Sequence, residues 1–486
     1  MRPARVHAWL SLVALLLACG SAGDGAGGPP PAGTLTIESV RPPAGSTQAD
    51  PLSPIEVSFD AAVAPATVTA DAFPLTRDGA AVASAAAYDA PNRSAVITAP
   101  LLPGASYGAA VETTVEGDGG EHLDQRFAWS FATRPWEATP LEPVPGSKGL
   151  ALTADPDGRL HLLFWTPAAG GGEELRYATC ATQCLVPANW TTVTLDQAND
   201  GGPVAILADG GSLQIAYQKA STAKLFYAAC NAGCTTAGSW QAAQLDLAAQ
   251  DGHEAITLAG DATGRVHLGT VVWNGSGLQF GVAYATCASA CTTPTNWQTT
   301  TIAPDGSSPS LLAEPTGRVH LVYRDPAANT LRYATCGGGC EMAGNWSDGP
   351  VDLTANTSTA TALAMDAAGA LHTAYLASGG VRYATCAGAC DQSGDWQSTA
   401  IADAGDLRVQ IGLALGETGR VHVIYGRSTQ LEYATCVSEC VVRANWQVGI
   451  GLPAADVRHL SLVRGSAGGL HMAFEDILTF DVGYAE

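Results

Sequence analysis

A short phrase, LRYATCGGGCEMAGNW at residues 331–346, has five relatives elsewhere in the chain. The first cysteines of the six copies are spaced at intervals of about 50 residues, and they are Cys180, Cys230, Cys287, Cys336, Cys386 and Cys436. A second phrase of the type GRVHLVY precedes each copy and returns once more near the C-terminus. Repetition at a fixed period indicates that one supersecondary unit is used many times. The repeat therefore limits the fold to a solenoid, a propeller or an array.

One repeat unit, residues 359–402, contains four short strands separated by tight turns and by the cysteine loop. Four strands at this period are typical of a β-propeller blade. The last unit, ending at residues 482–486, lacks a fourth strand, whereas residues 136–142 form an unassigned strand whose Trp136 matches the tryptophan of the other fourth strands. We therefore expect seven blades, closed by an N-terminal strand that completes the last blade and removes exposed sheet edges.

Twelve of the 13 cysteines form C-x-x-x-C pairs. An even set at fixed spacing in an exported protein indicates disulfides, each stabilising its hairpin by about 2 kcal/mol. Zinc is the alternative, but each pair supplies only two of four ligands, so we expect neither a metal nor a cofactor. Blade seven, joined from two chain ends, has no such loop. The expected pairs are Cys180 with Cys184, Cys230 with Cys234, Cys287 with Cys291, Cys336 with Cys340, Cys386 with Cys390, and Cys436 with Cys440.

The N-terminus has the features of an export signal. Arg2 and Arg5 precede the apolar run AWLSLVALLLAC, which is too short to span a bilayer and is typical of a signal peptide. Its end, LLAC, resembles the lipobox of bacterial lipoproteins. That resemblance implies a signal peptide at residues 1–18 and lipid on Cys19; a plain secreted protein is the alternative. Because Gly20 stands where enteric lipoproteins carry the retention aspartate, the resemblance favours an outer-membrane or surface location.

Composition limits the partners. The net charge of −22, with only 23 Lys and Arg residues, argues against nucleic acid, whose binding needs clustered cations. Residues 19–33 are rich in Gly, Ala and Pro and form a tether rather than a core. No other apolar run approaches the ~20 residues of a membrane-spanning helix, so we expect membrane attachment through the lipid on Cys19.

Residues 34–134 alternate short strands with Pro and Gly turns, which predicts a β-sandwich. The phrases VSFDAAV at 57–63, LLPGASYGAAV at 101–111 and WSFAT at 129–133 resemble bacterial Ig-like domains of the SbsA type. This resemblance implies a spacer or adhesive module. The expected fold class is therefore all-β, with an Ig-like β-sandwich followed by a seven-bladed β-propeller at residues 135–486.

The propeller repeats resemble those of sialidase-like propellers. Such repeats usually carry an Asp-box, Ser-x-Asp-x-Gly-x-x-Trp, in the hairpin that the cysteine loop occupies here. Only its end remains, as in Gly344, Asn345 and Trp346. A sialidase-like site would need three arginines, an acidic Asp and a Tyr paired with a carboxylate, and no Phe-Arg-Ile-Pro phrase occurs. The resemblance thus implies the fold more than an activity.

Two sets of residues are candidates for a site. Recurrent histidines in the second strands favour a packing role within each blade, because every unit repeats them; they are His161, His267, His320, His372, His422 and His471. Departures from the repeat are better candidates. The starts of the innermost strands, which border one mouth of the channel, hold Lys148, His253 with Glu254, Ser307, Thr359, Arg408, and Arg458 with His459.

The cations among them, Lys148, Arg408 and Arg458, suggest a site for an anionic group such as a carboxylate; ordinary surface ion pairs are the alternative. Trp165 and Trp273 lie in lengthened parts of the same face and are candidates for stacking on a sugar or for capping a blade. We find no catalytic motif. The expected function is a lipoprotein whose propeller binds a glycan or a protein; the alternatives are an exo-glycosidase and a purely structural envelope protein.

Overall fold

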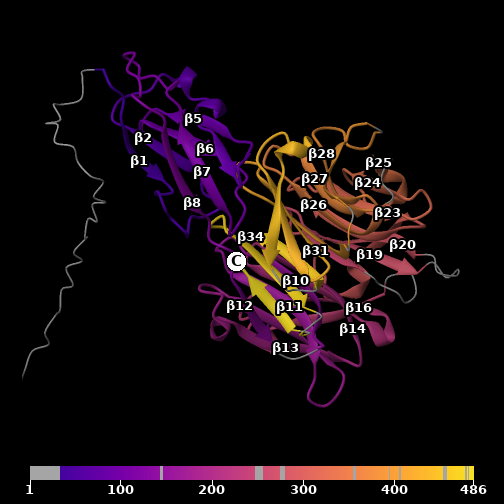
Figure 1. Cartoon of the computed structure of the whole chain (residues 1–486). Coiled ribbons are helices and arrows are strands. Elements are labelled where there is room, and N and C mark those ends of the chain that lie inside the picture. Colours follow the sequence, from indigo (N-terminus) through magenta and orange to yellow (C-terminus); the bar gives the residue numbers. More distant parts are fainter. Residues whose placement is uncertain are drawn as a thin grey trace, which may run out of the picture.

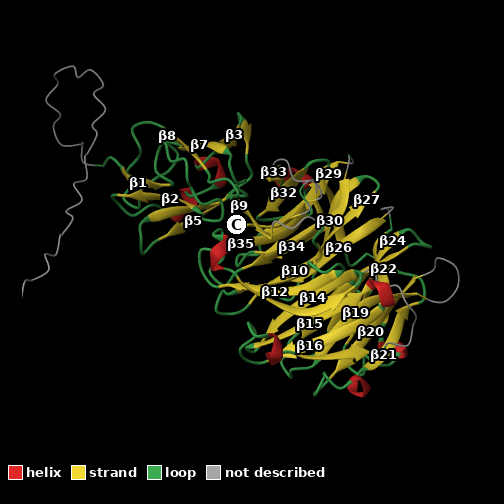
Figure 2. Ribbon diagram, turned by 90° about the horizontal axis from the view of Figure 1, so that it is seen from below, coloured by secondary structure: helices red, strands yellow, loops and turns green. Residues whose placement is uncertain are grey.

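The chain forms two β-rich parts joined by a short segment (Figures 1 and 2). The structure is a computed structural model that describes residues 33–142, 146–246, 255–273, 280–353, 357–392, 394–403, 405, 407–452, 457–476, 479 and 481–486. Among these residues, every helix is a single 3-10 turn. No helix in the described ranges is long and apolar enough to cross a membrane.

The N-terminal part is a sandwich of two four-stranded sheets, ordered β1-β2-β6-β5 and β4-β3-β7-β8. Alternate side chains of β2 face the second sheet, because successive residues of a strand point to opposite faces. Val57 and Phe59 are fully buried and pack with Trp129 and Phe131 in one core. The elements are β1 (Ile37–Arg41), β2 (Ile55–Phe59), η1 (Pro65–Thr67), η2 (Ala70–Ala72), β3 (Leu75–Arg77), β4 (Ala80–Ala81), β5 (Ala85–Asp89), β6 (Ser94–Thr98), β7 (Ser106–Val111) and β8 (Phe127–Ala132).

Seven more four-stranded sheets form the propeller. Blade one has β10 (Lys148–Ala154), β11 (Leu160–Pro167), β12 (Glu173–Cys180) and β13 (Thr191–Ala198); blade two has β14 (Gly201–Asp209), β15 (Ser212–Lys219), β16 (Lys224–Cys230) and β17 (Gln241–Leu245). Blade three has β18 (Ile256–Gly260), β19 (Val266–Trp273), β20 (Phe280–Cys287) and β21 (Gln298–Ala303); blade four has β22 (Ser307–Ala313), β23 (Val319–Asp325), β24 (Thr330–Cys336) and β25 (Ser347–Asp352).

The remaining blades follow the same plan. Blade five has β26 (Thr357–Met365), β27 (Leu371–Ala377), β28 (Gly380–Cys386) and β29 (Gln397–Asp403); blade six has β30 (Leu407–Leu415), β31 (Val421–Arg427), β32 (Gln430–Cys436) and β33 (Gln447–Leu452). Blade seven has β34 (Val457–Arg464), β35 (Leu470–Asp476) and β36 (Asp481–Ala485), completed by β9 (Ala138–Glu142). β9 pairs antiparallel with β36, and Tyr484 lies opposite Thr139. The predicted sandwich, seven blades and N-terminal closing strand are confirmed.

A ring of aromatic contacts joins each blade to the next. The tyrosine of one third strand meets the tryptophan of the next fourth strand edge to face, with centroids 5.0 to 6.0 Å apart. This T-shaped arrangement suits the opposite charges of ring edge and ring face. The pairs are Tyr177 with Trp240, Tyr227 with Trp297, Tyr284 with Trp346, Tyr333 with Trp396, Tyr383 with Trp446, Tyr433 with Trp136, and Tyr484 with Trp190.

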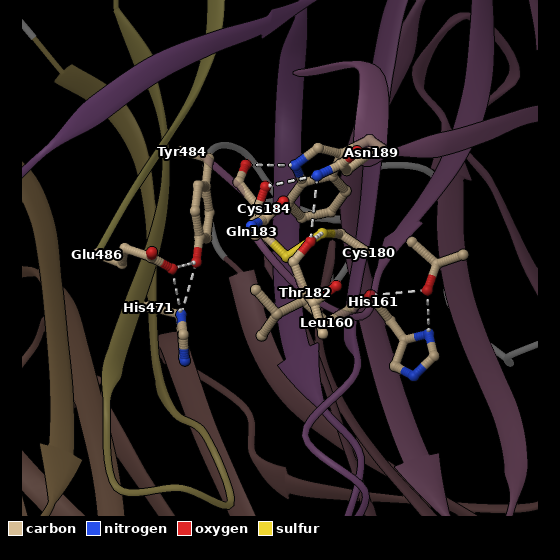
Figure 3. The surroundings of a disulfide bond; sticks show 12 residues. Leu160, His161, Cys180, Thr182, Gln183, Cys184, Asn189, His471, Tyr484 and Glu486 are labelled. Atoms are coloured by element: carbon tan, nitrogen blue, oxygen red, sulfur yellow. Dashed lines mark hydrogen bonds and ion pairs between the residues drawn. A yellow bond between two sulfur atoms is a disulfide. The ribbon is translucent and has the colours of Figure 1, made fainter. Parts of the chain in front are cut away.

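Six disulfides close the loops between the third and fourth strands, each joining cysteines four residues apart. In every such loop the tryptophan indole N–H donates to the carbonyl of the second cysteine, at 2.7 to 2.9 Å. Figure 3 shows the loop of blade one, with Asn189 bonded to the carbonyls of Thr182 and Gln183. The loops also hold 3-10 turns: η3 (Pro187–Asn189), η5 (Ala237–Ser239), η6 (Pro294–Asn296), η7 (Ala343–Asn345) and η8 (Arg443–Asn445), while η4 (Ala220–Thr222) precedes β16.

The sandwich rests on blades six and seven, and the C-terminus lies at this junction (Figure 1). Arg420, in the turn between β30 and β31, is buried; its guanidinium donates to the carbonyls of Pro51 and Leu101, at 2.8 and 3.0 Å. Leu102 of the sandwich shares a core cluster with blades six and seven. In other blades the matching arginines Arg159 and Arg318 are exposed. An arginine that recurs in the repeat therefore joins the two domains in blade six.

We expect Trp297→Ala to lower the free energy of unfolding by about 3–5 kcal/mol, because it leaves a cavity between two blades. Met342→Ala is the control, since this side chain is 56% exposed and should change stability by at most about 0.5 kcal/mol. Urea unfolding followed by fluorescence measures both. Equal effects would contradict a structural role for the aromatic ring.

Arg420→Ala should weaken the interdomain contact, because it leaves the carbonyls of Pro51 and Leu101 without their donor, at about 1–3 kcal/mol for each group. Calorimetry should then show the sandwich melting separately and earlier than the propeller. Arg318→Ala, at the matching exposed position of blade four, should leave the transition unchanged. A parent-like transition for Arg420→Ala would count against this arginine as the link.

Candidate functional site

The repeated histidines belong to the framework of their blades. In each of six blades the histidine Nδ1 lies 2.5 to 2.7 Å from the hydroxyl of the tyrosine on the neighbouring strand. In four of these blades Nε2 also faces a carboxylate: His161 with Asp155, His267 with Asp261, His320 with Glu314, and His372 with Asp366. Figure 3 shows His161 in blade one and His471, which bonds Tyr484, in blade seven. The predicted packing role is confirmed.

Burial sets the protonation of these histidines. It lowers the pKa of His161, His267, His320 and His372 below the ordinary histidine value, more than the facing carboxylates raise it. Burial alone would raise the pKa of Glu314. Hydrogen bonds from His320 and Thr316 lower it by more, so the pKa of Glu314 lies below its ordinary value. Within the described ranges no group of three or more His, Cys, Asp or Glu side chains is arranged for a metal ion.

The sequence predicts a ligand-binding face at the starts of the innermost strands. In blade one the innermost strand, β10, begins at Lys148, and this side chain contacts two acidic residues. The Lys148 ammonium lies 3.1 Å from Glu173, at the start of β12, and also contacts Asp200, before β14. Burial lowers the Lys148 pKa, but hydrogen bonds to Asp200 and Glu173 raise it above its ordinary value. The positive charge of Lys148 is therefore balanced by two carboxylates, in agreement with the alternative interpretation that it forms ordinary ion pairs.

The neighbouring blade supplies a histidine–carboxylate pair at the same mouth. His459 of β34 is half-buried, and its Nδ1 bonds the carboxylate of Glu475, which is 1% exposed at the end of β35. The backbone amide nitrogen of Gly149, the residue after Lys148, lies 3.4 Å from the same His459 nitrogen. The Lys148 and His459 pairs therefore form one charged cluster across the seam between blades seven and one, which we call the mouth cluster: Lys148, Glu173, Asp200, His459 and Glu475.

Other predicted ligand-face residues are placed differently. Arg458 is exposed beside the mouth cluster. His253 and the side chains of Arg408 and Trp273 lie outside the described part of the chain. Trp165 is fully buried and packs edge to face on Tyr217, so it offers no stacking surface. The burial of Trp165 counts against the stacking alternative but not against the blade-capping one, and the close approach of Gly201 in the next blade leaves room for the indole inside.

Sequence reasoning missed Glu475, although a signal for it existed. The position four residues after the histidine, or after Gln214 in blade two, varies from blade to blade, unlike the tyrosine of the third strand. It holds Trp165, Gln218, Val271, Arg324, Leu376, Gly426 and Glu475. A buried carboxylate is costly unless it is paired, so the acidic member of this set predicts a partner. Aligning the seven second strands would have drawn attention to Glu475, but not to His459 as its partner.

The mouth cluster can act as a mixed donor and acceptor surface. Three carboxylates face one ammonium and one imidazole, so hydroxyl groups of a ligand would find both acceptors and donors there. Charge-assisted hydrogen bonds of this kind are stronger than neutral ones. A bare anionic ligand would meet more negative than positive side chains in this cluster, although Arg458 lies nearby.

Comparison with known protein families matches residues 32–133 to the bacterial Ig-like domain family. Domains of this family occur in bacterial surface proteins. Comparison with curated protein sequences gives no match. The family match covers the sandwich only.

Comparison with solved structures finds similarity to two sialidases and an arabinofuranosidase at very low identity. The NanB sialidase of Streptococcus pneumoniae is 8% identical, covers 87% of this chain and 92% of its own, and has a TM-score of 0.39. The intramolecular trans-sialidase of Ruminococcus gnavus is 10% identical, with coverages of 71% and 95% and a TM-score of 0.38. An α-L-arabinofuranosidase of Lactobacillus brevis is 13% identical, with coverages of 52% and 87% and a TM-score of 0.33. At these scores we draw no functional conclusion from the likeness.

The histidine–carboxylate pairs predict that acid destabilises the protein. Burial lowers the pKa values of these histidines in the native protein. The unfolded chain therefore binds more protons than the native chain as the pH falls below about 6.5, and the free energy of unfolding should decrease with the pH. His320→Gln should reduce this pH dependence, because Gln214 already bonds Tyr227 in the same way in blade two. The exposed His122→Gln is the control. Unchanged pH dependence of unfolding in His320→Gln would contradict the assignment.

Proposed function

We propose that the protein is an exported lipoprotein whose propeller binds a polyhydroxylated ligand, a glycan in preference to a protein, at the mouth cluster. Lipid on Cys19 and the tether at residues 19–33 would hold the folded part at an outer membrane or cell surface. The observation that supports the proposal is the placement of the two domains. The sandwich contacts the turn that holds Arg420, at the opposite end of the strands from Lys148 and His459.

The docking leaves the mouth cluster accessible. Among the described residues no hydrogen bond or ion pair joins the sandwich to the cluster, and Asp200 has a side chain that is 54% exposed. A spacer attached to one face of a propeller presents the other face outward, as a binding head needs. Cluster carboxylates would accept bonds from sugar hydroxyls, and Lys148 with His459 would donate to ring or carbonyl oxygens.

The composition of the cluster refines the ligand expected from sequence. An anionic ligand was predicted from Lys148, Arg408 and Arg458, but Lys148 is already paired with two carboxylates. Neutral sugars carry no charged group, so they avoid repulsion from Glu173 and Asp200. We therefore favour a neutral glycan, bound through several charge-assisted hydrogen bonds of about 1.5–3 kcal/mol each.

A glycan array with the purified, oxidised protein tests the proposal. We expect binding of neutral glycans, and Glu475→Gln should weaken it about tenfold, because His459 loses its charged partner. Glu341→Gln, in the cysteine loop of blade four at the other end of the strands, should bind like the parent protein. Equal binding by both variants would place the ligand elsewhere.

Absence of glycan binding by the parent protein would remove the glycan assignment and favour a protein ligand or a structural role. Hydrolysis of a chromogenic glycoside by the parent protein, lost in Glu475→Gln, would instead favour the exo-glycosidase alternative. A buried carboxylate bonded to a histidine is a suitable acid–base pair for such a step. Binding without hydrolysis is the expected result.

A further inference from the structure

Two turns of the repeat at the domain junction lack an acid that four other blades carry. Six residues before the histidine, these four blades carry Asp155, Asp261, Glu314 and Asp366. At this position blade six carries Gly416 and blade seven carries Gly465, although both blades retain the histidine. The turn of blade six lies where the sandwich contacts the propeller, because it ends in Arg420.

In the complete turns the acid is held by a set of donors. Asp261 of blade three accepts hydrogen bonds through one carboxylate oxygen from the amides of Thr263 and Arg265, at 2.9 and 3.1 Å, and from the Thr263 hydroxyl at 2.6 Å. Its other oxygen faces Nε2 of His267 at 3.4 Å. Each turn of this kind is therefore a receptor for a planar carboxylate, filled by its own side chain.

Blade six keeps this receptor without the carboxylate. Thr418 and Arg420 stand where Thr263 and Arg265 stand in blade three. The turn closes in the same way: the Gly416 amide bonds the Arg420 carbonyl at 2.7 Å, as the Asp261 amide bonds the Arg265 carbonyl at 3.1 Å. Only the acidic side chain is missing, so the amides that would bind it remain in place.

Because Gly416 has no acidic side chain, the buried His422 lacks the carboxylate partner that its counterparts have in four other blades. It is 2% exposed, and its Nδ1 lies 2.6 Å from the Tyr433 hydroxyl. Within the described residues its Nε2 has no hydrogen-bond partner. Burial, with Arg420 and Arg464 nearby, lowers the pKa of His422 well below the ordinary value. The ring is therefore neutral, and in the tautomer whose Nδ1 accepts from the Tyr433 hydroxyl, Nε2 carries a hydrogen to donate.

A cleft between the two domains opens onto this turn. Its volume is about 440 Å³, and its walls include Gly416, His422 and three arginines, Arg134, Arg420 and Arg464. Two acids also line it, but each already faces an arginine: Asp50 lies 3.6 Å from Arg134, and Glu417 lies 2.6 Å from Arg464. Arginine guanidinium groups match carboxylates geometrically, so the cleft has both the space and the charge for a small acid.

We propose that this interdomain cleft binds a small carboxylic acid whose carboxylate takes the position that the missing acidic side chain has in the sister blades. One oxygen accepts from the amides of Thr418 and Arg420, and the other accepts from His422 Nε2. Arg134 and Arg464, which face Asp50 and Glu417, line the rest of the cleft. The site is independent of the mouth cluster, which lies at the other end of the strands.

Titration calorimetry with the intact protein tests the site, using acetate, glucuronate, glucose and sulfate as probes. We expect acetate to bind with a Kd on the order of 1 mM. Glucuronate should bind more tightly if the ligand is a sugar acid, and no more tightly if the carboxylate alone is recognised. Glucose should not compete with acetate for the cleft, because it has no carboxylate. Sulfate is tetrahedral and should bind at least about tenfold more weakly than acetate, a difference of about 1.4 kcal/mol.

Gly416→Asp supplies the absent carboxylate from the chain itself. Four sister blades already carry an acid in this turn, so the variant should fold, and its melting temperature without ligand should rise. Acetate binding should weaken by about tenfold or more. Ala367→Asp adds the same charge at an exposed site in the matching turn of blade five and should keep the acetate affinity within about threefold, because solvent screens its charge.

Two results would overturn the proposal. One is that the parent protein binds neither acetate nor glucuronate at concentrations of tens of millimolar. The other is that Gly416→Asp, shown by its melting curve to be folded, binds as tightly as the parent. Sulfate binding equal to that of acetate would overturn the assignment to a carboxylate. Because glucose and glycan binding belong to the mouth cluster, their failure would not affect this site.

Discussion

The propeller depends on one composite contact that is made seven times. A tyrosine on the third strand bonds, through its hydroxyl, the histidine or glutamine of its own blade, while its ring meets the tryptophan of the next blade. One side chain thus ties the strands within a blade and the blades to each other. Because the contact is both polar and aromatic, it specifies the spacing of neighbouring blades as well as their cohesion. Other parts of the repeat vary around it.

The two aromatic contacts of blade seven show how the ring closes although that blade is built from two separate segments of the chain. Trp136, from the strand between the two domains, meets Tyr433 of blade six, and Tyr484 near the C-terminus meets Trp190 of blade one. The Trp136 indole N–H is buried and has no hydrogen-bond partner among the described residues, because blade seven lacks the cysteine loop whose carbonyl serves the other six. Pro51 and Leu52 of the sandwich lie beside this indole instead. The Ig-like domain thus covers the place of the seventh loop.

Much of this architecture could be predicted from sequence because it is local and repeated. The strand order, the closure by Trp136 and the cysteine pairs follow from the spacing of residues along one chain. The pairing of Lys148 with Asp200, and the burial of Trp165, depend on side chains that meet across blades, which spacing does not reveal. Arg420 could not be distinguished from Arg318 before the position of the sandwich was known. Gly416 was visible in the alignment of turns, but its meaning depends on the cleft beside it.

The path of the chain between the two domains has a mechanical consequence. β8 of the sandwich ends at Ala132 and the closing strand β9 begins at Ala138, so only a short segment separates them. A pull on the N-terminal end of the sandwich is passed directly to β9, which lies antiparallel to β36 and is held by ladder hydrogen bonds along the strand. Force along the strands loads several of these bonds together, whereas force across them would break them one at a time. Arg420 and the core around Leu102 carry part of the same load, so the junction is also the point where tension enters the ring.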